Sequence, residues 1–262
     1  MLAACSAPAE QKAKTDAAQS EAKPDAPPAP PVPPPAISPT TFTDNAKKDA
    51  AEREFTYIWP AKVAAIPGLV TQLTADRDKL LAEQKADWQE SLREFAGEDC
   101  VACTNRTFEK TWEVVADVPR FLSLSGGFYA YTGGAHGNGA MDALVWDREA
   151  KAALDPKAMF TSEAALQSAL CDPWCKALRA QRSERLGPEY ADDSLFECPA
   201  IAELTVLLGS SDGKSFNRIG LYAAPYVAGS YAEGDYEITL PVTPKLLGVV
   251  KSAYKPAFAL GT

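Results

Sequence analysis

Residues 121–147 read FLSLSGGFYAYTGGAHGNGAMDALVWD, and this stretch decides how the chain folds. It contains two strand-like runs, residues 121–131 and 141–147, that are rich in apolar and aromatic side chains. The glycine-rich segment between them permits a reversal of the chain, because glycine adopts positive φ angles without steric cost. We therefore predict a hairpin here.

The flanking sequence adds strands in groups and only a few helices. Further strand-like runs cover residues 54–59, 108–118, 204–208, 216–222 and 236–240. Helical spacing of apolar residues predicts two main helices, residues 69–95 and 161–185, and Thr243-Pro244 begins a short C-terminal helix. This order favours an α+β fold with an antiparallel sheet over alternating βαβ units. No second linker or internal repeat interrupts residues 42–262, which we predict to be one domain.

The composition excludes several classes of function. The chain has 262 residues, 26 basic and 35 acidic side chains, and a formal net charge of −9. That balance argues against nucleic-acid binding, which needs a clustered basic surface. A single histidine excludes catalytic zinc sites built from two or three imidazoles, and we expect no cofactor. No run of about eighteen apolar residues predicts a transmembrane helix.

The N-terminus has the pattern of a bacterial lipoprotein. Leu2-Ala3-Ala4-Cys5 matches a lipobox, so we interpret residues 1–5 as a signal-peptide remnant and expect Cys5 to carry lipid. Residues 6–41 are rich in Ala, Pro, Lys and Glu and almost lack large apolar side chains, which predicts a disordered tether. In extended PPII form such a tether reaches up to roughly 100 Å. We therefore expect a membrane-anchored protein of the bacterial cell envelope, although residues 27–35 could also be a ligand for an SH3-like domain.

Five cysteines lie in the predicted domain. In an exported protein cysteines are expected to form disulfides, and an odd number leaves at least one thiol without an intramolecular partner. We favour Cys175–Cys198, which would tie the second main helix to the segment that follows it, and next Cys100–Cys103. Two alternatives stay open: a redox role for Cys100 and Cys103, and a four-thiolate zinc site that adds Cys171 and Cys175 to them.

The hairpin loop holds the only histidine, among four glycines in the seven residues 133–139. Glycine allows the backbone to approach a ligand closely, so the candidate binding residues here are Tyr131, Gly133, Gly134, His136 and Asn138. The imidazole could contact a ligand, or it could only fix the loop through hydrogen bonds. We favour a mainly structural role for His136, with the loop forming part of a binding surface.

A hydrolase that uses His136 is the rival interpretation, and a purely structural envelope lipoprotein is the third. Candidate nucleophiles and orienting carboxylates are Ser123, Ser125, Ser210, Asp142 and Asp147. None of these serines lies in a G-x-S-x-G turn, so we expect a protein without catalytic residues.

Two separated motifs resemble a known family. Tyr131-Thr-Gly-Gly-Ala-His136 resembles its glycine-glycine-alanine-histidine motif, and residues 143–147 resemble the strand that follows it. Residues 225–234 resemble its second motif and residues 236–241 its terminal strand. The family comprises the extracytoplasmic domain of RsiV-type anti-sigma factors and the N-terminal module of PdaC-type peptidoglycan deacetylases. The resemblance covers roughly residues 50–255.

The resemblance implies a binding module. In the anti-sigma factors this domain binds lysozyme, and in the deacetylases a separate metal-dependent domain carries the chemistry. The single histidine here cannot supply the several metal ligands of that catalytic domain. The second motif adds Tyr226, Gly229 and Tyr231 to the candidate binding residues. The expected partner is an envelope protein such as lysozyme, or peptidoglycan.

Overall fold

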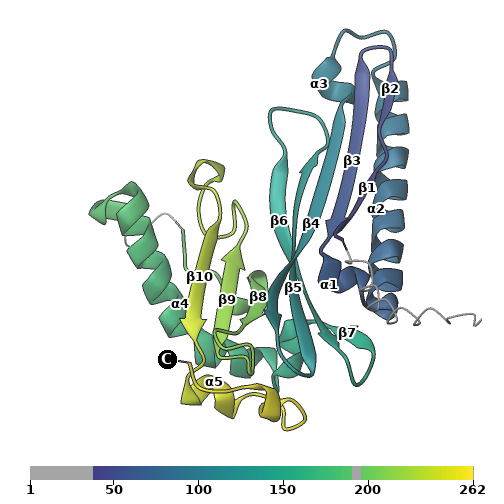
Figure 1. Cartoon of the computed structure of the whole chain (residues 1–262). Helices are drawn as coiled ribbons and strands as arrows, with labels where there is room; N and C mark the ends of the chain where they lie inside the picture. Colours follow the sequence, from purple (N-terminus) through teal and green to yellow (C-terminus); the bar gives the residue numbers. More distant parts are fainter. Residues whose placement is uncertain (1–37, 191–195, 262) are drawn as a thin grey trace, which may run out of the picture. The chain divides into compact units, whose positions relative to one another are not determined.

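The computed structural model describes residues 38–190 and 196–261, and these residues form the predicted α+β fold (Figure 1). The larger sheet contains β1 (Thr40–Thr43), β2 (Ala46–Lys48), β3 (Ala51–Trp59), β4 (Arg106–Asp117), β5 (Phe121–Tyr131), β6 (Asn138–Asp147) and β7 (Ala152–Leu154). The smaller sheet contains β8 (Thr205–Gly209), β9 (Arg218–Ala223) and β10 (Tyr236–Pro241). The α-helices are α1 (Ala61–Ala64), α2 (Pro67–Glu94), α3 (Val101–Thr104), α4 (Glu163–Leu186) and α5 (Pro244–Gly248).

β5 and β6 form the predicted hairpin, which pairs from Phe121 opposite Asp147 to Ala130 opposite Asn138. β6 begins at Asn138 and not at the predicted Met141, because main-chain pairing continues through small residues that carry little strand signal of their own. The larger sheet has the order β1-β3-β4-β5-β6-β7, and β2 pairs with β3. The smaller sheet has the order β10-β9-β8.

One strand pair corrects the prediction of an antiparallel sheet: β3 and β4 run parallel. A parallel pair needs a crossover connection, and α2 supplies it by carrying the chain back along the sheet. β3 starts at Ala51, before the predicted residue 54. β1 includes residues 40 and 41, which were predicted to belong to the tether. The rest of that tether up to residue 37, with the lipid site at Cys5, lies outside the described residues.

α2 covers one face of the larger sheet, as Figure 1 shows. It begins with Pro67, a position where the missing N–H of proline removes no helix hydrogen bond, and it ends one residue before the predicted boundary. Its apolar stripe faces the sheet and encloses the first hydrophobic core. That core includes Phe55, Tyr57, Leu69, Leu73, Leu81, Trp112, Leu122 and Leu124.

α4 and the smaller sheet enclose the second core. The Ser162 hydroxyl accepts a hydrogen bond from the N–H of Ala165 at 3.1 Å, so α4 starts at Glu163 and not at the predicted Thr161. The helix ends before Gly187, as predicted. The core between α4 and the sheet includes Leu166, Leu170, Trp174, Leu178, Val206, Leu208, Ile219 and Leu221.

The C-terminal segment closes this second core. Phe216 forms an isolated bridge with Phe258, so β9 begins at Arg218 and not at the predicted residue 216. Thr243 caps the predicted short helix α5, because its hydroxyl accepts a hydrogen bond from the N–H of Leu246 at 3.2 Å.

β5 belongs to both cores, and this positions the candidate site. Leu122 and Leu124 face α2, while Phe121 faces the core of the smaller sheet. β8 packs against β4, β5 and β6 at this end. Farther along β5 the smaller sheet no longer covers the strand, and Tyr129 is 41% exposed. The upper part of the larger sheet in Figure 1 is therefore open on the face opposite α2.

The cysteines pair as predicted. Cys175–Cys198 and Cys100–Cys103 are disulfides, and Cys171 is free. Cys100 and Cys103 bracket the start of α3, a short helix where the sequence indicated only a turn. The alternative of a four-thiolate zinc site is wrong, because three of its four proposed sulfur ligands are in these disulfides. Within residues 38–190 and 196–261, no cluster of His, Cys, Asp or Glu could hold a metal ion, and no helix is long and apolar enough to cross a membrane.

Candidate binding site

The hairpin loop is fastened to α3. Gly133 and Gly134 have φ angles of 98° and 92°, which side chains rarely adopt. The N–H of Gly134 donates to the carbonyl of Ala102 at 3.3 Å, and the Tyr131 hydroxyl lies 2.8 Å from the Gly134 carbonyl and 3.1 Å from that of Ala102. Tyr131, Gly133 and Gly134, which we predicted as binding residues, thus have an evident structural task.

His136 connects the two sequence motifs in space. Its ring stacks on Tyr231 with centroids 3.8 Å apart and an interplanar angle of 18°. Its Nδ1 lies 3.0 Å from the Gly137 carbonyl, and its Nε2 lies 3.4 Å from the Tyr226 hydroxyl. The imidazole itself is exposed. Two loops about ninety residues apart in sequence therefore meet at this side chain.

Gly137, one of the four loop glycines but not one of the predicted binding residues, is the close-packed centre of the loop. A Cβ there would lie 2.5 Å from the Tyr129 ring and 2.6 Å from the Ala130 carbonyl, so only glycine fits. The Gly137 carbonyl accepts a hydrogen bond from the Tyr231 hydroxyl at 3.0 Å. Asn138, a predicted binding residue, opens β6 with its side chain exposed.

The second motif is built around Glu233. Its carboxylate accepts hydrogen bonds from the Ser230 N–H at 2.7 Å and the Tyr236 hydroxyl at 2.8 Å. Burial opposes ionisation of Glu233, but these donors hold its pKa below the usual range. A Cβ at Gly229 would lie 2.4 Å from the same carboxylate, so this predicted binding residue is a packing position. The Ser-x-x-Glu spacing of residues 230–233 is a capping-box signal that could have identified Glu233 from sequence.

Whereas Tyr231 is half-buried, Tyr226 is the exposed tyrosine of the second motif. Its φ angle is 73°, a left-handed conformation that costs of order 1 kcal/mol or more for a residue with a side chain. Its side chain is 58% exposed, and its ring centroid lies 5.6 Å from that of Tyr231. We call Tyr129, His136, Tyr226 and Tyr231 the aromatic platform.

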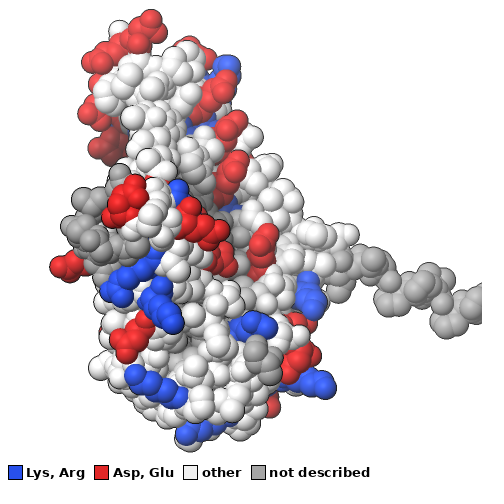
Figure 2. Space-filling model, turned by 90° about the vertical axis from the view of Figure 1, so that its left-hand side faces the viewer, with Lys and Arg blue, Asp and Glu red and all other residues white. Residues whose placement is uncertain are grey.

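The platform borders the open face of the larger sheet. Side chains alternate between the two faces of a strand. Phe55, Lys110 and Trp112 face α2, so the residues directly before and after them in β3 and β4 point away from α2. The glutamates on this open face are Glu52, Glu54, Glu109 and Glu113, all exposed. Figure 2 looks at the molecule from this side and shows acidic side chains gathered in its upper part.

Most of this acidic charge is not neutralised. Glu52 lies 2.6 Å from Lys47 at the edge of the sheet. Within the described ranges, Glu54, Glu109 and Glu113 make no ion pair. Glu109 pairs across the strands with Tyr129, whose ring also contacts Gly137. The acidic face and the aromatic platform are therefore one continuous surface.

The residues considered for a hydrolase are buried or have other partners. Ser123 is fully buried. The Ser210 hydroxyl donates to Asp212 at 3.0 Å, and Asp147 forms an ion pair with Arg120 at 2.6 Å. His136 makes its polar contacts with Gly137 and Tyr226 instead, so none of these candidate groups is hydrogen-bonded to the imidazole.

Asp142 is exposed, but its carboxylate belongs to a polar network around the buried Lys110 that the sequence did not reveal. Lys110 is 2% exposed, and its ammonium lies 2.6 Å from Asp142 and 2.9 Å from Asp76. The Tyr57 hydroxyl donates to Asp76 at 2.7 Å and accepts from the Trp112 indole at 2.7 Å. Burial, and then the hydrogen bond to Asp76, raise the pKa of Tyr57. This network joins α2 to β3, β4 and β6. The signal that could have predicted it is a lysine at an inward position between two aromatic residues of β4.

Comparison with known families supports the resemblance drawn from the sequence. Residues 36–139 match the family described as "Deacetylase PdaC". This range contains the first motif with His136, and the second motif lies outside it. No curated protein sequence matches the chain.

Solved structures show that the fold is shared. A DUF3298 family protein from Pseudomonas aeruginosa is similar with a TM-score of 0.53 and 14% identity, over 85% of this chain and 96% of that one. A DUF3298 family member from Bacteroides fragilis has a TM-score of 0.51 and 17% identity, over 84% and 95% of the two chains. At these identities the likeness concerns the fold alone.

Proposed function

We propose that this chain is a non-catalytic binding module of the bacterial cell envelope whose ligand is a basic envelope protein of the lysozyme kind. The observation that carries the proposal is the surface on which exposed, unpaired glutamates adjoin the aromatic platform. The match of residues 36–139 to the PdaC family supports a role in the envelope.

Charge favours a protein ligand of opposite sign. The chain has a formal net charge of −9, and the open face concentrates part of it. Complementary charge speeds the association of an acidic surface with a basic partner, and it disfavours partners that are themselves acidic. Tyrosine is enriched at the centres of protein interfaces because a rigid ring gives contact area at low entropy cost. Tyr226 and Tyr129 offer such exposed rings, and the Tyr226 backbone has a strained conformation of the kind that clusters at binding sites.

Peptidoglycan is the second candidate, and the platform is the observation that favours it. His136 and Tyr231 are stacked, and the exposed ring of Tyr226 lies beside Tyr231, so this group of rings could pack against the apolar faces of sugar units. The two candidates depend on different parts of the surface. A protein ligand needs the glutamates, whereas a glycan needs mainly the rings.

The test is direct binding to lysozyme by calorimetry and to insoluble peptidoglycan by co-sedimentation. The double variant Glu109→Lys/Glu113→Lys reverses charge on the open face. Glu83→Lys/Glu90→Lys makes the same change on exposed positions of α2 and is the matched control. We expect the first variant to weaken lysozyme binding at least about tenfold, since like charges at an interface are costly. The control should change it less than about twofold.

Other outcomes assign the alternatives. Sedimentation with peptidoglycan that tolerates both charge reversals but is lost in Tyr226→Ala would favour the glycan. Turnover of envelope material that vanishes in His136→Ala would support the hydrolase. Absence of binding to either ligand would overturn the proposal.

We also propose that Cys5 carries lipid and that the proline-rich segment holds the domain away from the membrane. The proposal follows from the lipobox sequence of residues 2–5. Expressed behind a complete signal sequence, the protein should partition into detergent and incorporate labelled palmitate. Cys5→Ser should abolish both properties, and if it leaves them unchanged the protein is not a lipoprotein.

A further inference from the structure

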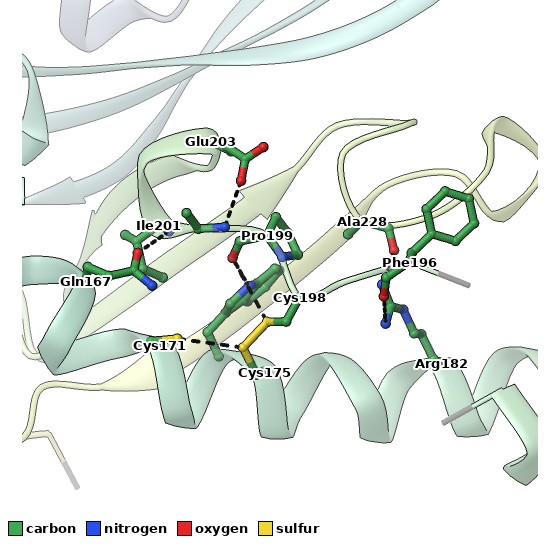
Figure 3. Close-up of a disulfide and its surroundings, with 12 residues drawn as sticks. Gln167, Cys171, Cys175, Arg182, Phe196, Cys198, Pro199, Ile201, Glu203 and Ala228 are labelled. Carbon is green, nitrogen blue, oxygen red and sulfur yellow. Dashed lines mark hydrogen bonds between the residues drawn. A yellow bond between two sulfur atoms is a disulfide. The ribbon is translucent and has the colours of Figure 1, made fainter. Parts of the chain in front are cut away.

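Three sulfur atoms lie together on α4. Cys171 and Cys175 are one helical turn apart, and their Sγ atoms are separated by 3.9 Å. Cys175 is already bonded to Cys198. Figure 3 shows Cys171 and Cys198 on opposite sides of the Cys175 sulfur in this view. The half-buried thiol of Cys171 is therefore next to the electrophilic sulfur of a disulfide.

We propose that Cys171 is a built-in attacking thiol that exchanges with the Cys175–Cys198 disulfide. The Cys171 thiol loses its proton to solvent, and the thiolate attacks Sγ of Cys175. A bond forms between Cys171 and Cys175, the Cys175–Cys198 bond breaks, and Cys198 leaves as a thiolate that takes up a proton. One disulfide and one thiol are present before and after the step, so it needs no oxidant or reductant.

The geometry also sets which pairing dominates. Side chains four residues apart on a helix have Cβ atoms about 5–6 Å apart, whereas a disulfide needs about 3.5–4.5 Å. The turn between Cys171 and Cys175 must therefore tighten to form the new bond. Pro173 lies inside this turn and cannot donate a helix hydrogen bond to the carbonyl of Ala169, which loosens the helix here and eases the change. The original pairing remains the major form, and the exchanged one is a minor form that can be trapped.

Release of Cys198 does not require its segment to leave the helix. The Trp174 indole donates to the Pro199 carbonyl at 3.2 Å. The Ile201 N–H donates to the Gln167 side chain at 2.7 Å. Figure 3 shows this segment lying along α4. Exchange thus moves the reactive thiol from the helix to Cys198 while the fold is kept, and it creates a modification site for small electrophiles and disulfides at Cys198.

Differential alkylation of the oxidised full chain tests the proposal. The protein is treated with iodoacetamide without denaturant from about pH 6 to about pH 9 and then digested with trypsin. Cys171 and Cys175 fall in the tryptic peptide 158–176, and Cys198 falls in the peptide 186–214. The original pairing gives these two peptides linked, with the label on Cys171. The exchanged form gives peptide 158–176 closed on itself and a separate peptide 186–214 labelled at Cys198.

We expect label at Cys198 to accumulate faster as the pH rises, because the thiolate is the nucleophile. The rate should not depend on protein concentration, since the step is intramolecular. Cys171→Ser should lower it at least tenfold. The Cys100–Cys103 pair should stay unlabelled, which excludes general scrambling. The proposal is overturned if Cys198 stays unlabelled at every pH, or if the linked peptides carry the label on Cys175, which would place the attack at Cys198.

Discussion

Replacing His136 with alanine separates the structural from the functional role of the loop. If the imidazole only fixes the hairpin, its removal should cost about 1–3 kcal/mol, because its hydrogen-bond partner would be left unsatisfied. The structure lowers this figure. The Gly137 carbonyl still accepts a hydrogen bond from the Tyr231 hydroxyl at 3.0 Å, so it is not left unpaired. The Tyr226 hydroxyl is exposed and can bond to water.

What His136→Ala removes is mainly the ring stack on Tyr231. An aromatic pair contributes about 0.5–1.5 kcal/mol beyond burial, and the imidazole is exposed, so we expect a loss near the lower end of this range. His136→Phe keeps a ring over Tyr231 and removes the polar atoms, and it should be nearly as stable as the wild type. Ligand affinity should fall in both variants if Nε2 contacts the ligand.

Urea unfolding gives the free-energy change, and binding to lysozyme and peptidoglycan gives the affinity. A loss of more than about 2 kcal/mol in both variants would refute the reasoning, because the polar contacts would then matter more than the stack. Unchanged stability in His136→Ala, together with loss of a hydrolytic turnover that the wild type shows, would establish a catalytic imidazole instead.

Two further predictions concern stability. Gly126→Ala should destabilise the protein by about 1–3 kcal/mol in urea unfolding, because the new Cβ would lie 3.0 Å from the Trp112 ring. Gly127→Ala has open space around the new Cβ and should change stability by less than about 0.5 kcal/mol. Equal effects of the two substitutions would contradict this packing. The hydrogen bond from Arg120 holds the pKa of Asp147 below its usual range. The ionised carboxylate therefore stabilises the fold at any pH above the pKa of an ordinary carboxyl group. This contribution is lost as the pH falls through the lowered pKa. Melting temperatures between about pH 5 and pH 3 should therefore fall more in the wild type than in Asp147→Asn, and parallel curves would exclude the contribution.

Local patterns in the sequence were enough to predict most elements of this protein. The helix over residues 67–94 follows from the spacing of its apolar side chains, because a helix repeats every 3.6 residues and needs one buried stripe. The hairpin of β5 and β6 follows from two apolar runs around a glycine-rich loop. The pairing of Cys175 with Cys198 follows from their positions on either side of a helix end. All of these depend on residues close together in the chain.

Long-range packing decided the rest. The parallel pairing of β3 with β4 depends on where α2 returns the chain, and strand patterns do not encode direction. The contact of His136 with Tyr226 and Tyr231 joins loops that only the arrangement of the two sheets brings together. The open face exists because the smaller sheet covers one half of β5 and not the other. Local sequence patterns reflect the environment of each segment, whereas these features depend on which distant segments meet.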